Sequence, residues 1–420
     1  MNIDEFLIIL FSNIPLYILA LALSMLLLTP LVKQYTKGVI DPLFYTLFMS
    51  GLANAIPFFL LFTNKIPIEK FIFFILAESF FWIGFSINAR KLIGFKDIEL
   101  VNNDRKNLIL FYIFLIIYIA LKLTAYSLLG IPVFHEEGRL SVFTNTGLGA
   151  LERFSTFPVF FCSVYVYHLF CGENKHKILG YFTISIIVLF SILSGSKGSV
   201  LILVTGYFIY SYFYQKKIIT FKEIKKYIPL LLIVPITVIA LQSTENSSNP
   251  IESLLIRFIA NGDCYYMAFP NDYVDFIQIS NKFTYFFNGI LSSFRLIDVS
   301  KVDVNIGLQL GWSINDIIDG SVFGPNTRPP ILGWVFFRWG GVLLTFLIGL
   351  FASFLIYKPA TLLPKGLLTS IFIGYTYYNL MTFVGDPTLA IGVVFDIIIN
   401  TFLFLFFYIL VYKGRVVYWN

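Results

Sequence analysis

Stretches of roughly 17 to 25 apolar residues, each long enough to cross a hydrocarbon core of about 30 Å, recur along almost the whole chain. The mean hydropathy is +0.81 and only 13% of the 420 residues are charged, a balance that a soluble domain of this length does not have. Runs such as Leu108 to Leu121 are apolar on every face, whereas a barrel strand alternates over about ten residues. We therefore expect an all-α polytopic membrane protein.

The apolar runs predict about eleven transmembrane helices. They lie near residues 14–32, 43–63, 70–89, 107–128, 151–171, 178–194, 199–214, 228–242, 331–357, 366–384 and 390–412. A break in the first apolar segment is also expected, because Ser12, Asn13 and Pro15 interrupt residues 3–32. The sequence has no internal repeat and no soluble segment of domain size, so residues 1–420 are expected to form one membrane domain.

Basic residues collect in every second loop between these runs. By the positive-inside tendency, those loops are cytoplasmic, the N-terminus is outside and the C-terminus is inside. The long polar interruption at 243–330 then becomes a large external loop, and the loops near 129–150, 195–198 and 385–389 share its side. Because so long a loop is rarely bare coil, we expect short helices or re-entrant pieces in it, for example Phe283 to Ile297 and Ile314 to Ile318.

The outward loops carry a small set of polar residues that suit phosphate binding. In the first of them, Arg139 precedes a glycine-bearing polar segment, and Arg153 follows at the next helix start. An arginine provides a bidentate fork and glycine-rich backbone offers N–H groups to an anion. His135, Glu136 and Glu137 stand beside Arg139 as candidate bases. A solvated turn is the plainer interpretation of the same segment.

Two further outward segments combine a cation with glycines. Lys197 lies in the turn Ser194-Gly-Ser-Lys-Gly-Ser199, where glycine-rich backbone at a helix start could hold an anion. Arg257 precedes Asn261, Gly262 and Asp263, whose carboxylate could act as a base. The structural alternatives are a tight turn, an arginine snorkelling at the membrane interface and an Asx turn.

The end of the long loop holds a third arginine. Arg328 is followed by Pro329 and Pro330, which force an extended entrance to the next helix, and then by aromatics up to Gly341. Packing at the membrane interface is the favoured role of these aromatics, although they could also stack on a sugar ring.

Four ionisable residues are predicted within spans, where such groups are costly and usually paired. Glu78 and Lys122 lie at comparable outer depths and could form an ion pair, and Arg338 and Asp396 are placed likewise. We favour structural pairing over a proton relay. The three cysteines are too few and too scattered for a disulfide framework or a metal site, so no metal and no cofactor is expected.

Taken in order, these segments resemble the O-antigen polymerase family, the Wzy-type oligosaccharide repeat-unit polymerases. The resemblance covers roughly residues 130 to 350. It is carried by Gly138-Arg139, by the turn around Lys197, by Arg257 with the following Gly262-Asp263-Cys-Tyr265-Tyr266, and by Pro325 to Gly341.

The resemblance implies a glycosyltransferase of the bacterial inner membrane, with a GT-C-like fold of ten to fourteen helices and an active site facing the periplasm. Such enzymes build O-antigen, in lipopolysaccharide biosynthesis, or a similar surface polysaccharide. They transfer a glycan from undecaprenyl pyrophosphate to another lipid-linked repeat unit without nucleotide sugar or metal. The partners it implies are the lipid-linked glycan, with a chain-length regulator and a flippase of the same pathway as candidates; nucleic acid is not among them.

The residues and the resemblance together give one mechanistic hypothesis. Arg139 and Arg257 hold the pyrophosphate, and Lys197 and Arg328 support them. One of His135, Glu136, Glu137 and Asp263 deprotonates the acceptor hydroxyl. Arg153, Asn261, Tyr265 and Tyr266 complete the expected substrate-binding set. A flippase for lipid-linked glycan and an O-antigen ligase remain alternatives.

Overall fold

The computed structural model describes residues 1–89, 96–99, 103–134, 149–171, 176–196, 198–225, 236–238, 260–292, 294, 296–298, 302–315 and 324–412. Over these residues the chain is almost entirely helical, and its only sheet pairs two short parallel strands, β1 (Lys96–Glu99) and β2 (Pro364–Lys365). The expectation of an all-α membrane protein is confirmed in this coarse form.

Seven helical segments of the described chain are long and apolar enough to cross a membrane. They are α2 (Ile14–Tyr35), α3 (Pro42–Phe62), α4 (Ile68–Ala89), α5 (Asp104–Leu129) with the short η1 (Pro132–Phe134), α7 (Gly149–Cys171), α17 (Pro329–Phe337) running through η7 (Arg338–Gly340) into α18 (Gly341–Leu362), and α21 (Pro387–Tyr412). Each agrees with a predicted span. The protein is therefore described as a multi-pass membrane protein.

Three other predicted spans are present as shorter helices, and the remaining one, near 228–242, lies largely outside the described residues. The shorter helices are α8 (Lys177–Leu193), α9 (Leu201–Ile209) continued by η2 (Tyr210–Tyr214), and α19 (Leu367–Leu380) followed by α20 (Thr382–Gly385). A four-residue helix, α10 (Phe221–Ile224), follows η2.

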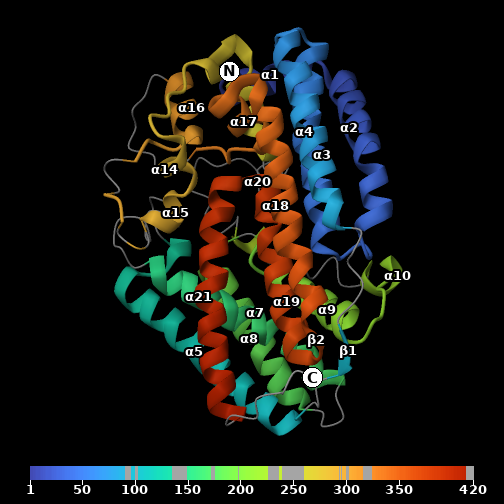
Figure 1. The fold of residues 1–420 in the computed structure, drawn as a ribbon, viewed down its shortest axis with the longest axis vertical. Coiled ribbons are helices and arrows are strands. Elements are labelled where there is room, and N and C mark those ends of the chain that lie inside the picture. Colours follow the sequence, from blue (N-terminus) through green and yellow to red (C-terminus); the bar gives the residue numbers. More distant parts are fainter. Residues whose placement is uncertain are drawn as a thin grey trace.

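The described part of the long loop contains short helices, as expected. They are η4 (Ala260–Gly262), α13 (Asp263–Ala268), η5 (Pro270–Asp275), α14 (Lys282–Phe286), α15 (Asn288–Leu291) and α16 (Ile306–Asn315). Of the two predicted pieces, Phe283 to Ile297 overlaps α14 and α15. Ile314 to Ile318 begins in the last residues of α16, and its residues 316–318 lie outside the described residues. Figure 1 shows these loop helices gathered at the end of the molecule that also holds α1 and α17.

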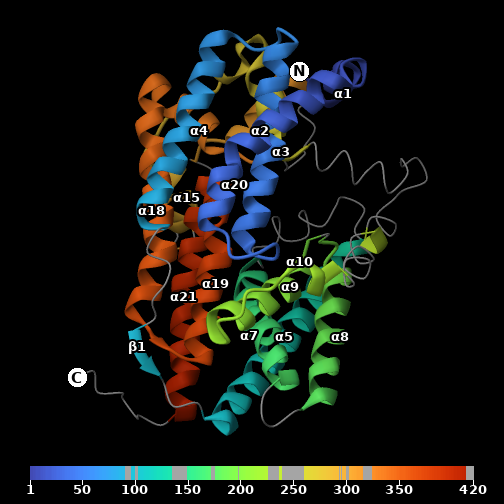
Figure 2. The same cartoon turned by 90° about the vertical axis from the view of Figure 1, so that its right-hand side faces the viewer.

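The predicted break near the N-terminus is also confirmed. Helix α1 (Ile3–Ser12) ends at Asn13, whose backbone angles of φ −134° and ψ 36° are not helical, and α2 begins directly after it with Pro15 in its first turn. The side chain of Asn13 turns back to donate to the carbonyl of Ile9 at 2.9 Å. As a result α1 points away from the line of α2, which Figure 2 shows at the upper end of the molecule.

The long helices occupy two halves of an elongated molecule (Figure 1). Helices α2, α3 and α4 lie in one half, α5, α7, α8 and α9 lie in the other, and the C-terminal helices α18, α19 and α21 connect the two. Contacts give the relative directions: Ala77 meets Thr345 and Asn88 meets Ser353, so α4 and α18 run parallel. The alternation of predicted spans requires this same relation.

Small residues let α4 and α18 approach until their backbones touch. A methyl group built on Gly84 would lie 2.2 Å from the carbonyl oxygen of Phe346, and one on Gly349 would lie 2.1 Å from the carbonyl oxygen of Phe81. Lipid tails are as apolar as leucine, so close packing of small residues is what holds such helices together. This contact fixes α17, and therefore the residue before it, relative to α4.

We expect Gly349→Ala to destabilise the protein by about 1–3 kcal/mol, the usual cost of forcing extra atoms into a packed core. The melting temperature of the detergent-purified protein measures this. Gly311→Ala is the matched control, because Gly311 is also helical and a methyl group there meets nothing within 4 Å. Equal melting temperatures for the two variants would contradict the tight α4–α18 contact.

Candidate functional site

The guanidinium of Arg328 lies inside the protein, where three segments that are distant in sequence converge. Its side chain is buried, with Nε donating to the carbonyl oxygen of Asn261 at 3.1 Å and Nη1 donating to Ser50 Oγ at 3.4 Å. Arg328 is the residue before α17, and its extended backbone (φ −64°, ψ 154°) follows from the proline after it. The prolines thus keep Arg328 in extended backbone before the first turn of α17, and its side chain points into the protein.

This guanidinium is short of counter-charge. Among the described residues no carboxylate lies within the 4.0 Å of an ion pair with Arg328. Arginine stays protonated in proteins, and a buried charge is costly unless it is paired. The arrangement therefore presents a positive charge to whatever anion can reach it.

Asp263 is the candidate base that lies within the described residues, and the charge of Arg328 acts on it. It is the first residue of α13 and is half-buried, with Oδ1 accepting from the backbone N–H of Cys264 at 2.9 Å. Burial raises the pKa of Asp263 to about 7, even though the positive charge of Arg328 acts to lower it. A carboxylate with a pKa near the working pH can both take a proton and release it.

The tyrosines that follow Asp263 are buried in different surroundings. The Tyr265 hydroxyl is buried beside Arg328, whose charge and side-chain hydrogen bonding act to lower its pKa, although burial has the larger effect and raises it. Tyr266 instead stacks on Phe6 of α1, with ring centroids 4.5 Å apart. Tyr265 therefore places a hydroxyl beside the cation, and Tyr266 anchors α13 to the N-terminal helix.

Gly262 allows this loop segment to pack closely against α3. A methyl group on Gly262 would lie 2.7 Å from the carbonyl oxygen of Ala53, so only glycine allows η4 to sit against the helix at this level. Ser50, which accepts from Arg328, is one turn earlier on the same helix. This close approach explains why a glycine stands between Asn261 and Asp263.

Two carboxylates that we did not select from the sequence border the same cluster. Glu78 accepts at 2.8 Å from both Asn54 Nδ2 and Trp82 Nε1, and its charge acts with burial to raise the pKa of the Tyr265 hydroxyl. The sequence marked Glu78 only as an ionisable residue within a span. Its nearness to Tyr265 depends on how α4 packs against α3 and the loop.

Asp386 is the second of these carboxylates. One of its oxygens accepts from the backbone N–H of Thr327 at 3.2 Å, and the other accepts from the N–H groups of Thr388 and Leu389 at the start of α21. It therefore ties the segment carrying Arg328 to the end of α21. The available signal was an aspartate before a proline, Gly385-Asp386-Pro387, in a loop predicted to face outward.

Arg153 belongs to another cluster. Its Nη1 lies 3.5 Å from Asp396 Oδ1 on α21. Asp396 is ten residues beyond Asp386 along this helix, which corresponds to about 15 Å at 1.5 Å per residue. Of the predicted site residues within the described chain, Asn261, Asp263, Tyr265 and Arg328 come together, Tyr266 packs behind them, and Arg153 does not join them.

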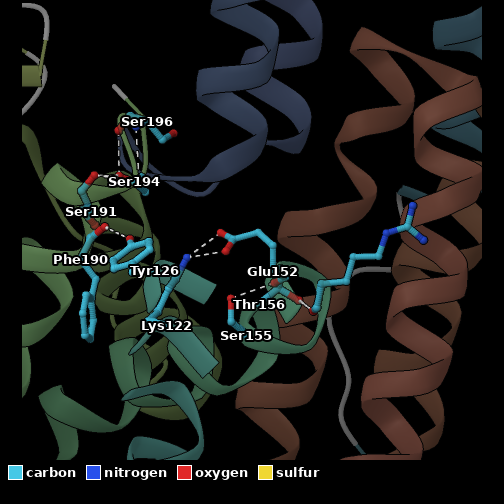
Figure 3. Close-up of polar contacts among 11 residues, drawn as sticks. Lys122, Tyr126, Glu152, Ser155, Thr156, Phe190, Ser191, Ser194 and Ser196 are labelled. Atoms are coloured by element: carbon cyan, nitrogen blue, oxygen red, sulfur yellow. Dashed lines mark hydrogen bonds and ion pairs between the residues drawn. The ribbon is translucent and has the colours of Figure 1, made fainter. Parts of the chain in front are cut away.

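Three of the four ionisable residues expected within spans form ion pairs, but with other partners than we expected, and Glu78 is held by the neutral side chains of Asn54 and Trp82. Lys122 Nζ lies 2.6 Å from Glu152, and Figure 3 shows its side chain reaching this carboxylate. Arg338 contacts Asp275, and Asp396 contacts Arg153. The predicted pairs Glu78 with Lys122 and Arg338 with Asp396 were wrong, because depth along a helix does not give the direction in which a side chain points.

The turn that precedes Lys197 is organised by its own serines. Ser194 Oγ donates to the carbonyl of Ser191 at 2.8 Å and accepts from the N–H of Ser196 at 3.3 Å, as seen in Figure 3. Lys197 itself lies outside the described residues, as do His135, Glu136, Glu137, Arg139 and Arg257. Their predicted roles remain predictions.

The described residues contain no group of three or more histidine, cysteine or acidic side chains placed to hold a metal ion. Comparison of the chain with protein-family models, with curated proteins and with solved structures finds no match. What can be argued about function therefore comes from the residues around Arg328.

The raised pKa of Asp263 predicts a pH-dependent stability. Between its ordinary pKa of 3.8 and its folded value of about 7, the folded state holds a proton that the unfolded state has lost. The contribution of this group is thus complete below about pH 4 and is lost as the pH rises to about 7. An asparagine side chain cannot titrate. As the pH falls from about 8 to about 5, the melting temperature of wild type should therefore rise relative to that of Asp263→Asn. A difference that stays constant over this range would contradict the shift.

Proposed function

We propose that this protein is a glycosyltransferase that polymerises lipid-linked oligosaccharide repeat units, using undecaprenyl pyrophosphate as the leaving group. One observation carries the proposal. Three residues chosen from sequence for this chemistry, Asn261, Asp263 and Tyr265, lie around the buried guanidinium of a fourth, Arg328, which has no ion-paired carboxylate among the described residues.

The chemistry requires a cation and a base close together. In the transfer, the bond between the donor sugar's anomeric carbon and the pyrophosphate oxygen breaks, and the acceptor hydroxyl oxygen forms the new glycosidic bond. Arg328 stabilises the negative charge that develops on the leaving pyrophosphate, with Arg139 and Arg257 as further proposed donors. Asp263 takes the proton of the acceptor hydroxyl.

The finer architecture belongs to the same proposal. We place eleven helices in the bacterial inner membrane, in a GT-C-like arrangement, with the Arg328 cluster on the periplasmic side. The support is the alternation of basic loops, which puts the long loop outside, and the parallel course of α4 and α18, which this alternation requires.

Reconstitution tests the activity directly. The purified protein in liposomes is given a synthetic undecaprenyl-pyrophosphate-linked repeat unit, and a ladder of products is expected. A single transfer to a lipid core would indicate a ligase, and movement of the lipid across the bilayer without bond formation would indicate a flippase. Either result would overturn the polymerase proposal.

Arg328→Lys should lower the rate by roughly 10²–10³, the usual cost of removing one preorganised donor from a developing oxyanion. Lysine keeps the charge but lacks the planar fork that binds two phosphate oxygens. Ladder formation in liposomes measures the rate. Arg105→Lys is the matched control, because Arg105 is exposed at the start of α5. An unchanged rate for Arg328→Lys, in a protein that melts like wild type, would exclude Arg328 from the reaction.

Asp263 should determine how the rate depends on pH. As a base it works only when ionised, so the rate should rise with pH up to about 7, where its pKa lies. Asp263→Asn should lower the transfer rate by a factor of about 10²–10⁴ and abolish the rise of the rate with pH. Retention of the same pH profile in Asp263→Asn would assign the base to another residue.

A further inference from the structure

Apart from the Arg328 cluster, a pocket of about 800 Å³ opens at the end of the molecule that holds α1. Its walls are α1, the turn between α3 and α4, and the beginning of η5, and Figure 2 shows α1 at this end beside α3. Five polar or charged side chains line it: Glu5, Asn64, Lys65, Asn271 and Asp272. We call it the α1 pocket.

The backbone around this pocket is held in an uncommon conformation. Five non-glycine residues of the described chain have a positive φ, and three of them line the α1 pocket: Asn64 at 53°, Asn271 at 55° and Asp272 at 56°. Asparagine and aspartate tolerate this conformation better than other residues, but two in succession need support. Because of this conformation, the backbone at Asn271 and Asp272 departs from a regular right-handed helix.

A buried lysine supplies that support. Lys70 Nζ lies 2.6 Å from Asp275 Oδ2, 3.7 Å from Asp272 Oδ1 and 3.8 Å from the ring centroid of Trp334. The Lys70 side chain is buried, whereas that of Asp272 remains 52% exposed. The lysine thus holds Asp272 from behind while the carboxylate still faces the opening.

The second carboxylate of this support is fixed in turn. Asp275 Oδ1 accepts from Trp334 Nε1 at 2.7 Å and contacts Arg338, which is itself in a positive-φ conformation. Asp272 is therefore set in place by a cluster of charged and aromatic groups that reaches from α4 to α17. A cluster of this extent fixes the floor of the pocket before any ligand arrives.

The lining excludes two classes of ligand. Its two cations, Lys65 and the N-terminal ammonium of Met1, are matched by the two carboxylates Glu5 and Asp272, so the pocket has no excess positive charge for a phosphate. An acyl or prenyl chain would leave these charged groups and both amides without partners, which is costly. The ligand that fits has many hydroxyl groups and little or no negative charge.

A sugar ring has that chemistry. Carboxylates accept hydroxyl protons, amides both donate and accept, and the apolar walls from Ile8, Pro67 and Pro270 suit the C–H faces of a ring. Resting on the function proposed above, we infer that the α1 pocket binds a sugar unit of the lipid-linked glycan. The α1 pocket recognises the sugar, while the Arg328 cluster binds the pyrophosphate.

The two sites are joined by one short helix. Asp263 begins α13 and Pro270–Asp272 follows its end, so the six residues of α13 separate them by about 9 Å at 1.5 Å per residue. The stacking of Phe6 on Tyr266 holds α1 against this same helix. The α1 pocket therefore begins about one short helix away from a pyrophosphate bound at Arg328, which is a distance that the attached sugar units can cover.

The test removes the two amides without disturbing the backbone. Because glycine adopts positive φ freely, Asn64→Gly with Asn271→Gly deletes the side chains and keeps the conformation. Lys216→Gly is the matched control, since Lys216 also has a positive φ of 57° and does not line the pocket. The probe is the free repeat-unit oligosaccharide, obtained by depolymerising the source strain's surface polysaccharide, with neither phosphate nor lipid.

Titration calorimetry on the purified full-length protein gives the dissociation constant. Wild type and Lys216→Gly should bind equally, and the double variant should bind about tenfold more weakly, as expected for two lost hydrogen bonds. Its melting temperature should match that of wild type. Absence of binding to wild type, or equal binding by the double variant, would overturn the assignment of the pocket.

Arg328→Lys separates this inference from the proposed function. It should bind the free oligosaccharide like wild type while failing to form the ladder. If Arg328→Lys transfers normally and the double variant still loses binding, the proposed role of the Arg328 cluster fails and the sugar site stands. If the ladder depends on Arg328 but the oligosaccharide does not bind, the sugar site fails alone.

Discussion

The arrangement depends on one buried positive charge. Removing a guanidinium from water costs several kcal/mol unless hydrogen bonds and counter-charge replace the solvent. Around Arg328 the replacement is incomplete: a carbonyl of η4 and a hydroxyl of α3 accept from it, and no described carboxylate pairs with it. The rest of the fold must therefore hold this side chain inward. The prolines after it, the tie from Asp386 to Thr327 and the tight α4–α18 contact all act in that direction.

The same charge determines what its neighbours can do. Asp263 lies near enough for Arg328 to favour its ionised form, yet burial has the larger effect, and the result is a carboxyl group that titrates near neutral pH. A direct ion pair would have kept Asp263 ionised and made it a weak base. Separation of the two groups by more than an ion-pair distance leaves both available, the guanidinium for an anion and the carboxylate for a proton.

Sequence could predict the helices and part of the site, for different reasons. Apolar runs such as α2 and α21 are long enough that length alone identifies them, and Asn13 with Pro15 marks the break before α2. Arg328 could be chosen because an arginine in an outward loop runs against the positive-inside tendency, and Asn261 and Asp263 because they form a polar turn with a candidate base. Glu78 and Asp386 could not be assigned to the site, since their nearness to it follows from packing between α3, α4 and α21. The partners of Lys122 and Arg338 were missed for the same reason, because a span gives a residue's depth but not the face on which it lies.

A ligand with a charged end and a polar, neutral end needs two environments at a fixed spacing, and α13 provides that spacing. At its first residue the surroundings are buried and positive; beyond its last residue they are open and polar, and the charges of the lining balance. A phosphate placed in the α1 pocket would find both cations already matched by Glu5 and Asp272. A sugar placed at Arg328 would leave the guanidinium without an anion. Each end of such a ligand is thus disfavoured in the wrong site. Orientation along α13 follows from charge, before any contact specific to a particular sugar is made.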